Sequence, residues 1–77
     1  MANPRNKGTG KGFAQALRQL RQEKGLSQEE LADRAGLHRT YISQIERGIK
    51  SPSLRSLERI ARALDVQLST LIKKMEN

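Results

Sequence analysis

Apolar residues recur along most of the chain at spacings of three and four residues, the pattern of helices that bury one face. Phe13, Leu17 and Leu20 mark the first such segment, which ends before Gly25. No stretch alternates apolar and polar residues as a half-buried strand does, and no internal repeat is present. The pattern therefore predicts an all-α chain of five short helices. The later helices are expected over about 28–35, 39–47 and 54–64, with a last one around Leu71, Ile72 and Met75.

Residues with strong preferences for helix ends support these boundaries. Ser27 and Glu30 have the spacing of a capping box, in which each side chain accepts a hydrogen bond from the other residue's backbone N–H. Gly36 and Gly48 follow the second and third helices, and glycine is favoured there because it adopts positive φ without strain. His38 precedes the third helix and is a poorer cap than serine. The fourth and fifth helices are expected to begin behind Ser53 and Ser69.

Residues 1–12 differ in composition from the rest of the chain. They contain three glycines, one proline and three basic residues, with no acidic residue and almost no apolar one. We therefore expect residues 1–12 to be a flexible basic arm and residues 13–77 to form the folded domain. Such an arm either lies in a minor groove of DNA or is a disordered tail that adds non-specific affinity, and we expect the disordered tail.

Residues 28–47 form the most informative unit of the sequence. Two short helices are joined there by only Gly36, Leu37 and His38, which is the pattern of a helix-turn-helix. Ala32 is small at the position where the two helices are expected to cross. Apolar side chains are predicted to fill the wedge between the helices: Leu37, Ile42 and Ile45.

A helical wheel of the third helix separates two faces at about 100° per residue. Tyr41, Ile42 and Ile45 lie on the inward face, with Glu46 at its edge. The outward face consists only of hydrogen-bonding side chains and holds no acidic residue: Arg39, Thr40, Ser43, Gln44 and Arg47. Alone, such a stripe is more often a solvated face. Because it follows the tight turn in a strongly basic chain, it favours contact with base edges in a DNA groove.

The overall composition narrows the classes of function. The 77 residues carry 15 Lys and Arg against 8 Asp and Glu, a net charge of +7, which favours a nucleic-acid partner. There is no Cys and one His, so neither a thiolate nor a His-rich metal site is expected, and no cofactor is expected either. No apolar run is long enough to span a membrane, and a soluble, cytoplasmic protein is the default expectation.

An enzyme is the least favoured class of function. The acidic residues Glu29, Glu30 and Asp33 are explained by the start of the second helix, where carboxylates are stabilised by the helix dipole. No nucleophile–base pair is apparent, and Gly8-Thr9-Gly10 lacks the following Lys-Ser/Thr pair and the helix context that a phosphate-binding loop requires.

The segment LSQEELADRAGLHRTYISQIERG, residues 26–48, resembles the phage-repressor and Cro-type helix-turn-helix family, the XRE group of bacterial and phage regulators. The resemblance extends from about Phe13 to Ile72 and implies a compact five-helix, lambda-repressor-like DNA-binding domain. The shorter pattern HRTYISQIERG is also similar to the controller proteins of restriction–modification systems, which are stand-alone dimeric domains. No small-molecule effector is then expected.

The resemblance implies a role for several individual residues. The base-contacting positions on the recognition helix match Arg39, Thr40, Ser43 and Gln44. Contacts with DNA phosphates are implied for Gln28, Arg18, His38, Tyr41, Arg47 and Lys50. Three of these stay open: His38 contacts a phosphate or a base or only caps the helix, the Tyr41 ring packs inward or its hydroxyl reaches DNA, and Ser43 reaches DNA directly or through water. Arg21 and Glu46 match a structural ion pair.

The last apolar stripe, formed by Leu68, Leu71, Ile72 and Met75, closes the core of the monomer or forms a dimer seam, and we expect part of it to serve each purpose. Dimerisation fits the expected function because one recognition helix contacts only three or four base pairs, whereas a two-fold dimer contacts two half-sites. The sequence thus predicts a sequence-specific regulator of transcription that binds a palindromic operator in double-stranded DNA as a homodimer. The alternative is a protein-interaction adaptor or an antitoxin-type module with the same fold.

Overall fold

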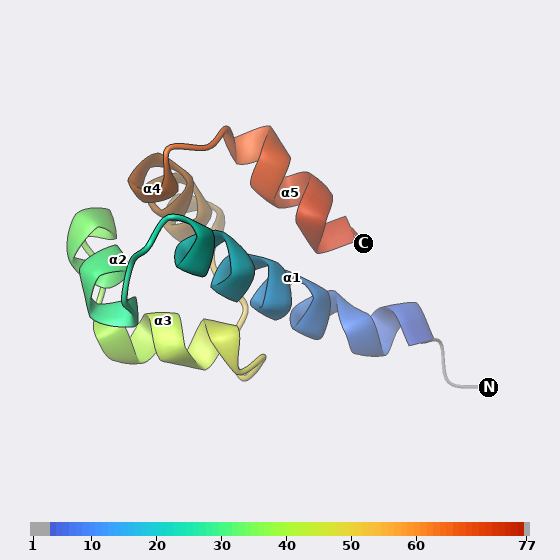
Figure 1. Cartoon of the computed structure of the whole chain (residues 1–77). Helices are drawn as coiled ribbons and strands as arrows, with labels where there is room; N and C mark the ends of the chain where they lie inside the picture. Colours follow the sequence, from blue (N-terminus) through green and yellow to red (C-terminus); the bar gives the residue numbers. More distant parts are fainter. Residues whose placement is uncertain (1–3, 77) are drawn as a thin grey trace.

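The computed structural model describes residues 4–76, with side chains placed for residues 12–74, and shows five helices joined by loops (Figure 1). The helices are α1 (Pro4–Glu23), α2 (Gln28–Ala35), α3 (Arg39–Glu46), α4 (Leu54–Leu64) and α5 (Leu68–Glu76). No strand occurs among residues 4–76. The prediction of an all-α chain is therefore confirmed.

The signals at the ends of α2 are confirmed in detail. Ser27 Oγ accepts a hydrogen bond from the backbone N–H of Glu30 at 3.0 Å, and Glu30 Oε1 accepts one from the N–H of Ser27 at 2.8 Å. The hydrogen bond from the Ser27 backbone N–H, with a smaller contribution from the Ser27 side chain, lowers the pKa of Glu30 because it stabilises the carboxylate form. At the other end Gly36 has φ +69° and turns the chain into α3. Ser53 caps α4 with one such bond, since its Oγ accepts a hydrogen bond from the backbone N–H of Ser56 at 3.1 Å.

Two boundaries differ from the expectation. The helix expected to start at Phe13 starts at Pro4, so the backbone of residues 4–12 is helical rather than irregular. Proline is well suited to a first helical turn, and lengthening an existing helix costs less than nucleating one. The prediction that Ser69 caps the last helix is wrong, because α5 already begins at Leu68 and its first N–H groups bond to the Gln67 carbonyl. The flexibility of the arm and the domain division at residue 13 stay predictions.

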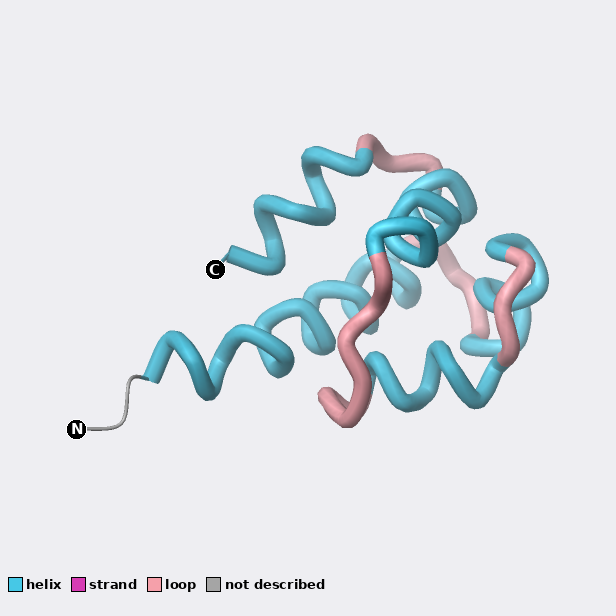
Figure 2. The backbone as a smooth tube through the Cα atoms, turned by 180° about the vertical axis from the view of Figure 1, so that it is seen from behind, coloured by secondary structure: helices cyan, strands magenta, loops and turns pink. Residues whose placement is uncertain are grey.

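The core is formed where the inward faces of all five helices meet. Fully buried side chains come from every helix: Leu17, Leu31, Ile42, Ile45, Ile60, Leu64 and Leu71. Each such side chain contributes about 1.5–3 kcal/mol of burial free energy. Helix α1 contacts α3 and α5, α2 contacts α3 and α4, and α4 contacts α5. Helix α3 is thus held from behind by α1 and α2, and its other side is left free (Figure 2).

Candidate nucleic-acid interface

The turn between α2 and α3 has the short, fixed geometry that the sequence predicts. The N–H of Leu37 bonds to the carbonyl of Ala32 at 2.8 Å, which closes the end of α2. The carbonyl of Gly36 accepts a hydrogen bond from Arg59 Nη1 of α4 at 3.3 Å. Arg59 was not anticipated, because an exposed arginine on a distant helix has no recognisable sequence pattern. The turn is therefore fixed from two sides.

The helical wheel of α3 is confirmed by burial. Ile42 and Ile45 are buried, whereas the predicted outward side chains are exposed or half-exposed: Arg39, Thr40, Ser43, Gln44 and Arg47. His38 is exposed and is the N-cap residue of α3, as expected; its carbonyl accepts hydrogen bonds from the N–H groups of Tyr41 at 3.0 Å and Ile42 at 3.2 Å, and its side chain makes no capping hydrogen bond. The outward face of α3 therefore presents donors and acceptors to solvent without an acidic group among them.

The segment that follows α3 is tied down at both ends. The Gln44 carbonyl accepts hydrogen bonds from the N–H groups of Ile49 at 2.9 Å and Lys50 at 3.3 Å. Tyr41 Oη accepts one from the N–H of Ser53 at 3.3 Å, and Lys50 Nζ lies 5.9 Å from the centre of the Tyr41 ring. The ring is half-buried against the core. The tyrosine thus joins α3 to the start of α4, as the packing interpretation predicts, while contact of its hydroxyl with DNA stays a prediction.

A buried carboxylate joins α3 to α1 and α2. The side chain of Glu46 has no exposed surface, and Arg21 binds it with two hydrogen bonds, Nε to Oε2 at 2.7 Å and Nη2 to Oε1 at 3.0 Å. Gln28 Nε2 donates to Oε1 at 3.0 Å, and Arg18 Nε lies 3.6 Å from the same oxygen. The predicted pair of Arg21 and Glu46 is therefore present, and the amide of Gln28 also bonds to Glu46.

The electrostatics of this cluster keep Glu46 ionised. Burial alone raises the pKa of Glu46, but the hydrogen bonds from Arg21 and Gln28 and the positive charge of Arg21 outweigh it, so the pKa is lowered overall. The hydrogen bond to Glu46 raises the pKa of Arg21. Arg21 also donates from Nη1 to the carbonyl of Leu26 at 2.8 Å, which fixes the loop before α2.

Two of the predicted phosphate contacts lie together although they are far apart in the sequence. Arg18 of α1 and Arg47 at the end of α3 line one shallow pocket of about 360 Å³, together with Ala14, Gln15 and Glu46. The side chain of Arg18 is half-exposed, and Arg47 is exposed. Gln15 was not among the predicted contacts, since nothing in the sequence of α1 distinguishes it from other polar residues.

The predicted dimer seam on α5 is only partly available. Leu71 has no exposed surface and packs in the core, so the prediction that its side chain contacts a second copy of the chain is wrong. Periodicity alone does not distinguish a core position from a seam. Leu68 and Ile72 are half-buried, and the side chain of Met75 lies outside the described residues. In contrast, Ile49 and Leu54 are the large apolar side chains exposed among residues 12–74, at 62% and 61%.

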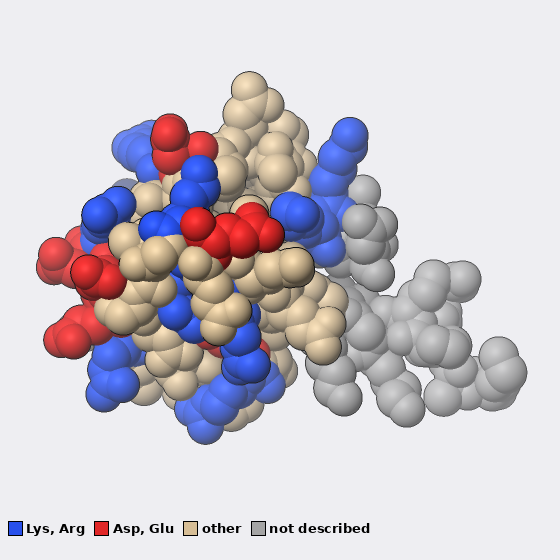
Figure 3. Space-filling model, viewed as in Figure 1, with Lys and Arg blue, Asp and Glu red and all other residues tan. Residues whose placement is uncertain are grey.

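The charges are distributed unevenly over the surface. On the face in Figure 3, the charged side chains along the lower edge, where α3 lies, are Lys and Arg, whereas at the left and across the upper part Asp and Glu alternate with further Lys and Arg. Among the described residues, no group of three His, Asp or Glu side chains is arranged to hold a metal ion. No helix in that part of the chain is long and apolar enough to cross a membrane.

Helices α2 and α3 are short and are joined by a three-residue turn, and the polar face of α3 is free. These features define a DNA-binding helix-turn-helix. Comparison with known proteins agrees. A family model described as "Helix-turn-helix" matches residues 17–71, and the chain therefore belongs to the XRE-type helix-turn-helix family. It carries the DNA-binding domain of a transcription regulator.

The relatives are regulators and control proteins rather than enzymes. Control protein C.BamHI of Bacillus amyloliquefaciens is 51% identical over 61 residues, which cover 78% of this chain and 75% of that protein. The crystal structure of the restriction–modification controller protein C.AhdI from Aeromonas hydrophila is similar with a TM-score of 0.79 and 45% identity, covering 80% of this chain and 94% of that one. The crystal structure of SinR, the master regulator for biofilm formation, in complex with DNA is similar with a TM-score of 0.74 and 43% identity. The match covers 78% of this chain and 97% of that one. The chain matches 59% of the length of SinR from Bacillus licheniformis.

Proposed function

We propose that this protein is a sequence-specific regulator of transcription that binds a palindromic operator as a homodimer, with α3 of each copy in the major groove. The observation that carries the proposal is the outward face of α3, which is free, polar and without acidic side chains. A solvated helix face has no need of that composition, whereas a helix in the major groove requires donors and acceptors that match base edges.

The base-contacting residues are Arg39, Thr40, Ser43 and Gln44. An arginine donates two hydrogen bonds to guanine, a glutamine pairs with adenine through its amide, and a threonine offers a hydroxyl and a methyl group. Each matched bidentate contact is worth about 1–3 kcal/mol of discrimination against a wrong base. Ser43 has a short side chain, and a bridging water extends its reach.

Contacts with phosphates position α3 and supply most of the affinity. Arg18 and Arg47 share one pocket beside α3, and Gln28 lies at the N-terminus of α2, where backbone N–H groups favour an anion. Gln28 donates one amide hydrogen to Glu46 and keeps the other for a phosphate. Lys50, the Tyr41 hydroxyl and His38 complete the proposed set from the two ends of α3.

The dimer follows from the number of bases that one helix contacts. A single α3 reaches about three or four base pairs, too few to define a site in a genome, and a two-fold dimer doubles that number. C.BamHI and C.AhdI are named as control and controller proteins, and this likeness supports a cytoplasmic regulator encoded by a bacterium or a phage.

Selection of bound duplexes from a randomised DNA library, at near-physiological salt, tests the proposal. The expected result is enrichment of an inverted repeat whose half-site centres lie about 10 base pairs, or a small multiple of one turn, apart. If the protein binds DNA at low salt but no sequence is enriched, the positive charge of the chain explains only non-specific binding to DNA. That result would favour the alternative function, a protein-interaction adaptor.

A further inference from the structure

The shallow pocket between α1 and the end of α3 contains a polar side chain that the proposed DNA contacts leave without a role. Its volume is about 360 Å³, and it is lined by Ala14, Gln15, Arg18, Glu46 and Arg47. Arg18 and Arg47 are proposed phosphate contacts, whereas Gln15 has no assigned partner. Gln15 is exposed and lies three residues before Arg18, so the two side chains are neighbours on the surface of α1.

The carboxylate in this pocket does not make it a site for a cation. The side chain of Glu46 has no exposed surface, and Arg21 neutralises it with hydrogen bonds of 2.7 Å and 3.0 Å. Arg18 Nε lies 3.6 Å from Glu46 Oε1, so the carboxylate holds this guanidinium beside the pocket while 51% of the Arg18 side chain stays exposed. The polar groups that the pocket presents to solvent are therefore two guanidinium groups and one amide, and they suit an anion.

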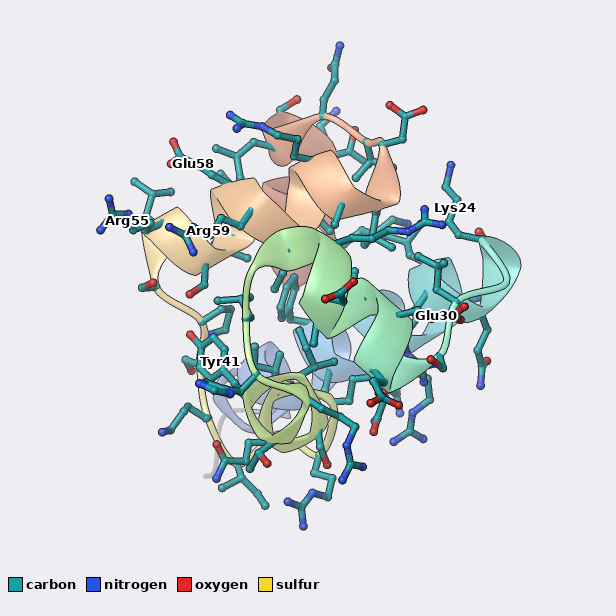
Figure 4. The ribbon with its side chains drawn as sticks, turned by 90° about the vertical axis from the view of Figure 1, so that its left-hand side faces the viewer. Lys24, Glu30, Tyr41, Arg55, Glu58 and Arg59 are labelled. Atoms are coloured by element: carbon teal, nitrogen blue, oxygen red, sulfur yellow. The ribbon has the colours of Figure 1, made fainter. Side chains whose placement is uncertain are left out.

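The α3 side of the pocket is also held in place. Arg47 Nε donates a hydrogen bond to the Ser43 carbonyl at 3.4 Å, and the backbone N–H of Arg47 bonds to the same carbonyl at 3.0 Å. Figure 4 looks along α3, with α1 behind it and α2 above it, and both helices contact α3. Side chains that are already anchored lose less conformational entropy when they bind a ligand.

We propose that Gln15, Arg18 and Arg47 hold one and the same DNA phosphate in this pocket, with the amide of Gln15 as the third donor. The inference rests on the proposed function and adds to it a residue and the sharing of a single phosphate. The two arginines supply positive charge, and the NH2 group of Gln15 donates a hydrogen bond without charge. Because α1 and the end of α3 both hold this phosphate, it fixes the position of α3 along the groove.

Gln15→Ala tests the third donor. The variant is expected to fold, because Gln15 is exposed within α1 and alanine favours a helix. Affinity for the selected operator should fall about three- to tenfold for each copy bound, since a hydrogen bond to a charged group is lost. The slope of log K against log salt should stay unchanged, because a neutral amide releases no counterion. Arg18→Ala, in contrast, should reduce the magnitude of that slope by about 0.9 for each copy bound.

Two matched controls separate the pocket from the rest of the surface. Gln19→Ala removes the same type of side chain from the same helix, but Gln19 lies outside this pocket and lines the neighbouring hollow towards Lys74 of α5. It should leave the affinity within about twofold. Lys24→Ala is the control for charge, because the Lys24 side chain points to the side of the molecule opposite to α3 (Figure 4). It should leave the slope nearly unchanged.

Replacing single phosphates of the operator by methylphosphonates tests whether the three side chains share one phosphate. A methylphosphonate keeps the shape of the diester but carries no charge. One position in each half-site is expected at which Gln15→Ala, Arg18→Ala and Arg47→Ala cause no further loss of affinity, whereas at the other positions their losses are retained.

Two results would overturn the shared site while the DNA-binding regulator stands. One is a Gln15→Ala variant that binds the operator as tightly as the wild type. The other is a loss for Gln15→Ala that disappears at a different phosphate from the losses of the two arginine variants. A wild type that prefers no duplex over any other would instead overturn the proposed function itself.

Discussion

The substitution Glu46→Gln tests how far the buried carboxylate stabilises the domain. The amide has almost the same shape as the carboxylate but no charge, so it removes the partner of Arg21, whose side chain is only 11% exposed. Breaking a buried ion pair from one side costs about 3–5 kcal/mol. Because the amide oxygen still accepts one hydrogen bond, the lower end of that range, about 3 kcal/mol, is expected.

That loss is large for a chain of this size. A domain of 60–100 residues loses about 4–8 °C of Tm for each kcal/mol, so Glu46→Gln should lower Tm by about 12–24 °C. Thermal unfolding followed by circular dichroism at pH 7 measures the shift, at equal protein concentrations because a dimer's Tm depends on concentration. Glu23→Gln is the control, since Glu23 is exposed at the end of α1, and its Tm should change by at most a few degrees.

The pH dependence provides a second check on the same residue. The pKa of Glu46 is lower in the folded chain than the ordinary value of about 4.3 that it has in the unfolded chain, so the folded state favours the ionised form. The contribution of Glu46 to the free energy of unfolding is therefore complete above the pKa that Glu46 has in the unfolded chain. It is lost as the pH falls through the pKa that Glu46 has in the folded chain. The gap in Tm between wild type and Glu46→Gln should narrow below about pH 4.3. A loss of Tm below about 4 °C at pH 7, or a gap that stays constant down to about pH 3, would contradict a stabilising role for the ionised Glu46.

Three further substitutions address the interface and the turn. Gln44→Ala should weaken binding to the selected operator by about 1–3 kcal/mol for each half-site and leave binding to unrelated DNA nearly unchanged, as measured by fluorescence anisotropy; equal losses on both duplexes would remove Gln44 from the base-contacting set. Arg47→Ala should weaken both and reduce the magnitude of the slope of log K against log salt by about 0.9 for each copy that is bound; an unchanged slope would remove Arg47 from the phosphate contacts. Gly36→Ala should lower stability by about 1–2 kcal/mol in urea unfolding, because φ is +69° and the added Cβ meets Arg59 Nη1 at 3.4 Å, and a neutral result would contradict the constraint at the turn.

Local signals in the sequence were sufficient for the part of the fold that forms the helix-turn-helix. The capping box of Ser27 and Glu30 and the positive φ of Gly36 are determined by residues within one or two turns of each other. The inward position of Ile42 and Ile45 follows from helical geometry alone. The pair of Arg21 and Glu46 was inferred from the resemblance to a family.

The features that the sequence did not reveal depend on tertiary structure. Helix α1 begins at Pro4 in a glycine-rich stretch without apolar periodicity, so no pattern indicated a helix there. Leu71 occupies a position that suits a core and a seam equally, and only the packing of α5 on α1 and α4 decides between them. The bond from Arg59 to Gly36 joins residues 23 positions apart. The exposure of Leu54 is equally a property of the assembled fold.

Duplex selection with Gln44→Arg beside the wild type tests whether the outward face of α3 contacts base edges. Arginine prefers guanine where glutamine prefers adenine. One symmetric position in each half-site of the selected motif should change toward guanine, while the other positions and the spacing between half-sites are retained. An identical motif for both proteins, each binding its site with undiminished affinity, would contradict the assignment of α3 as the recognition helix.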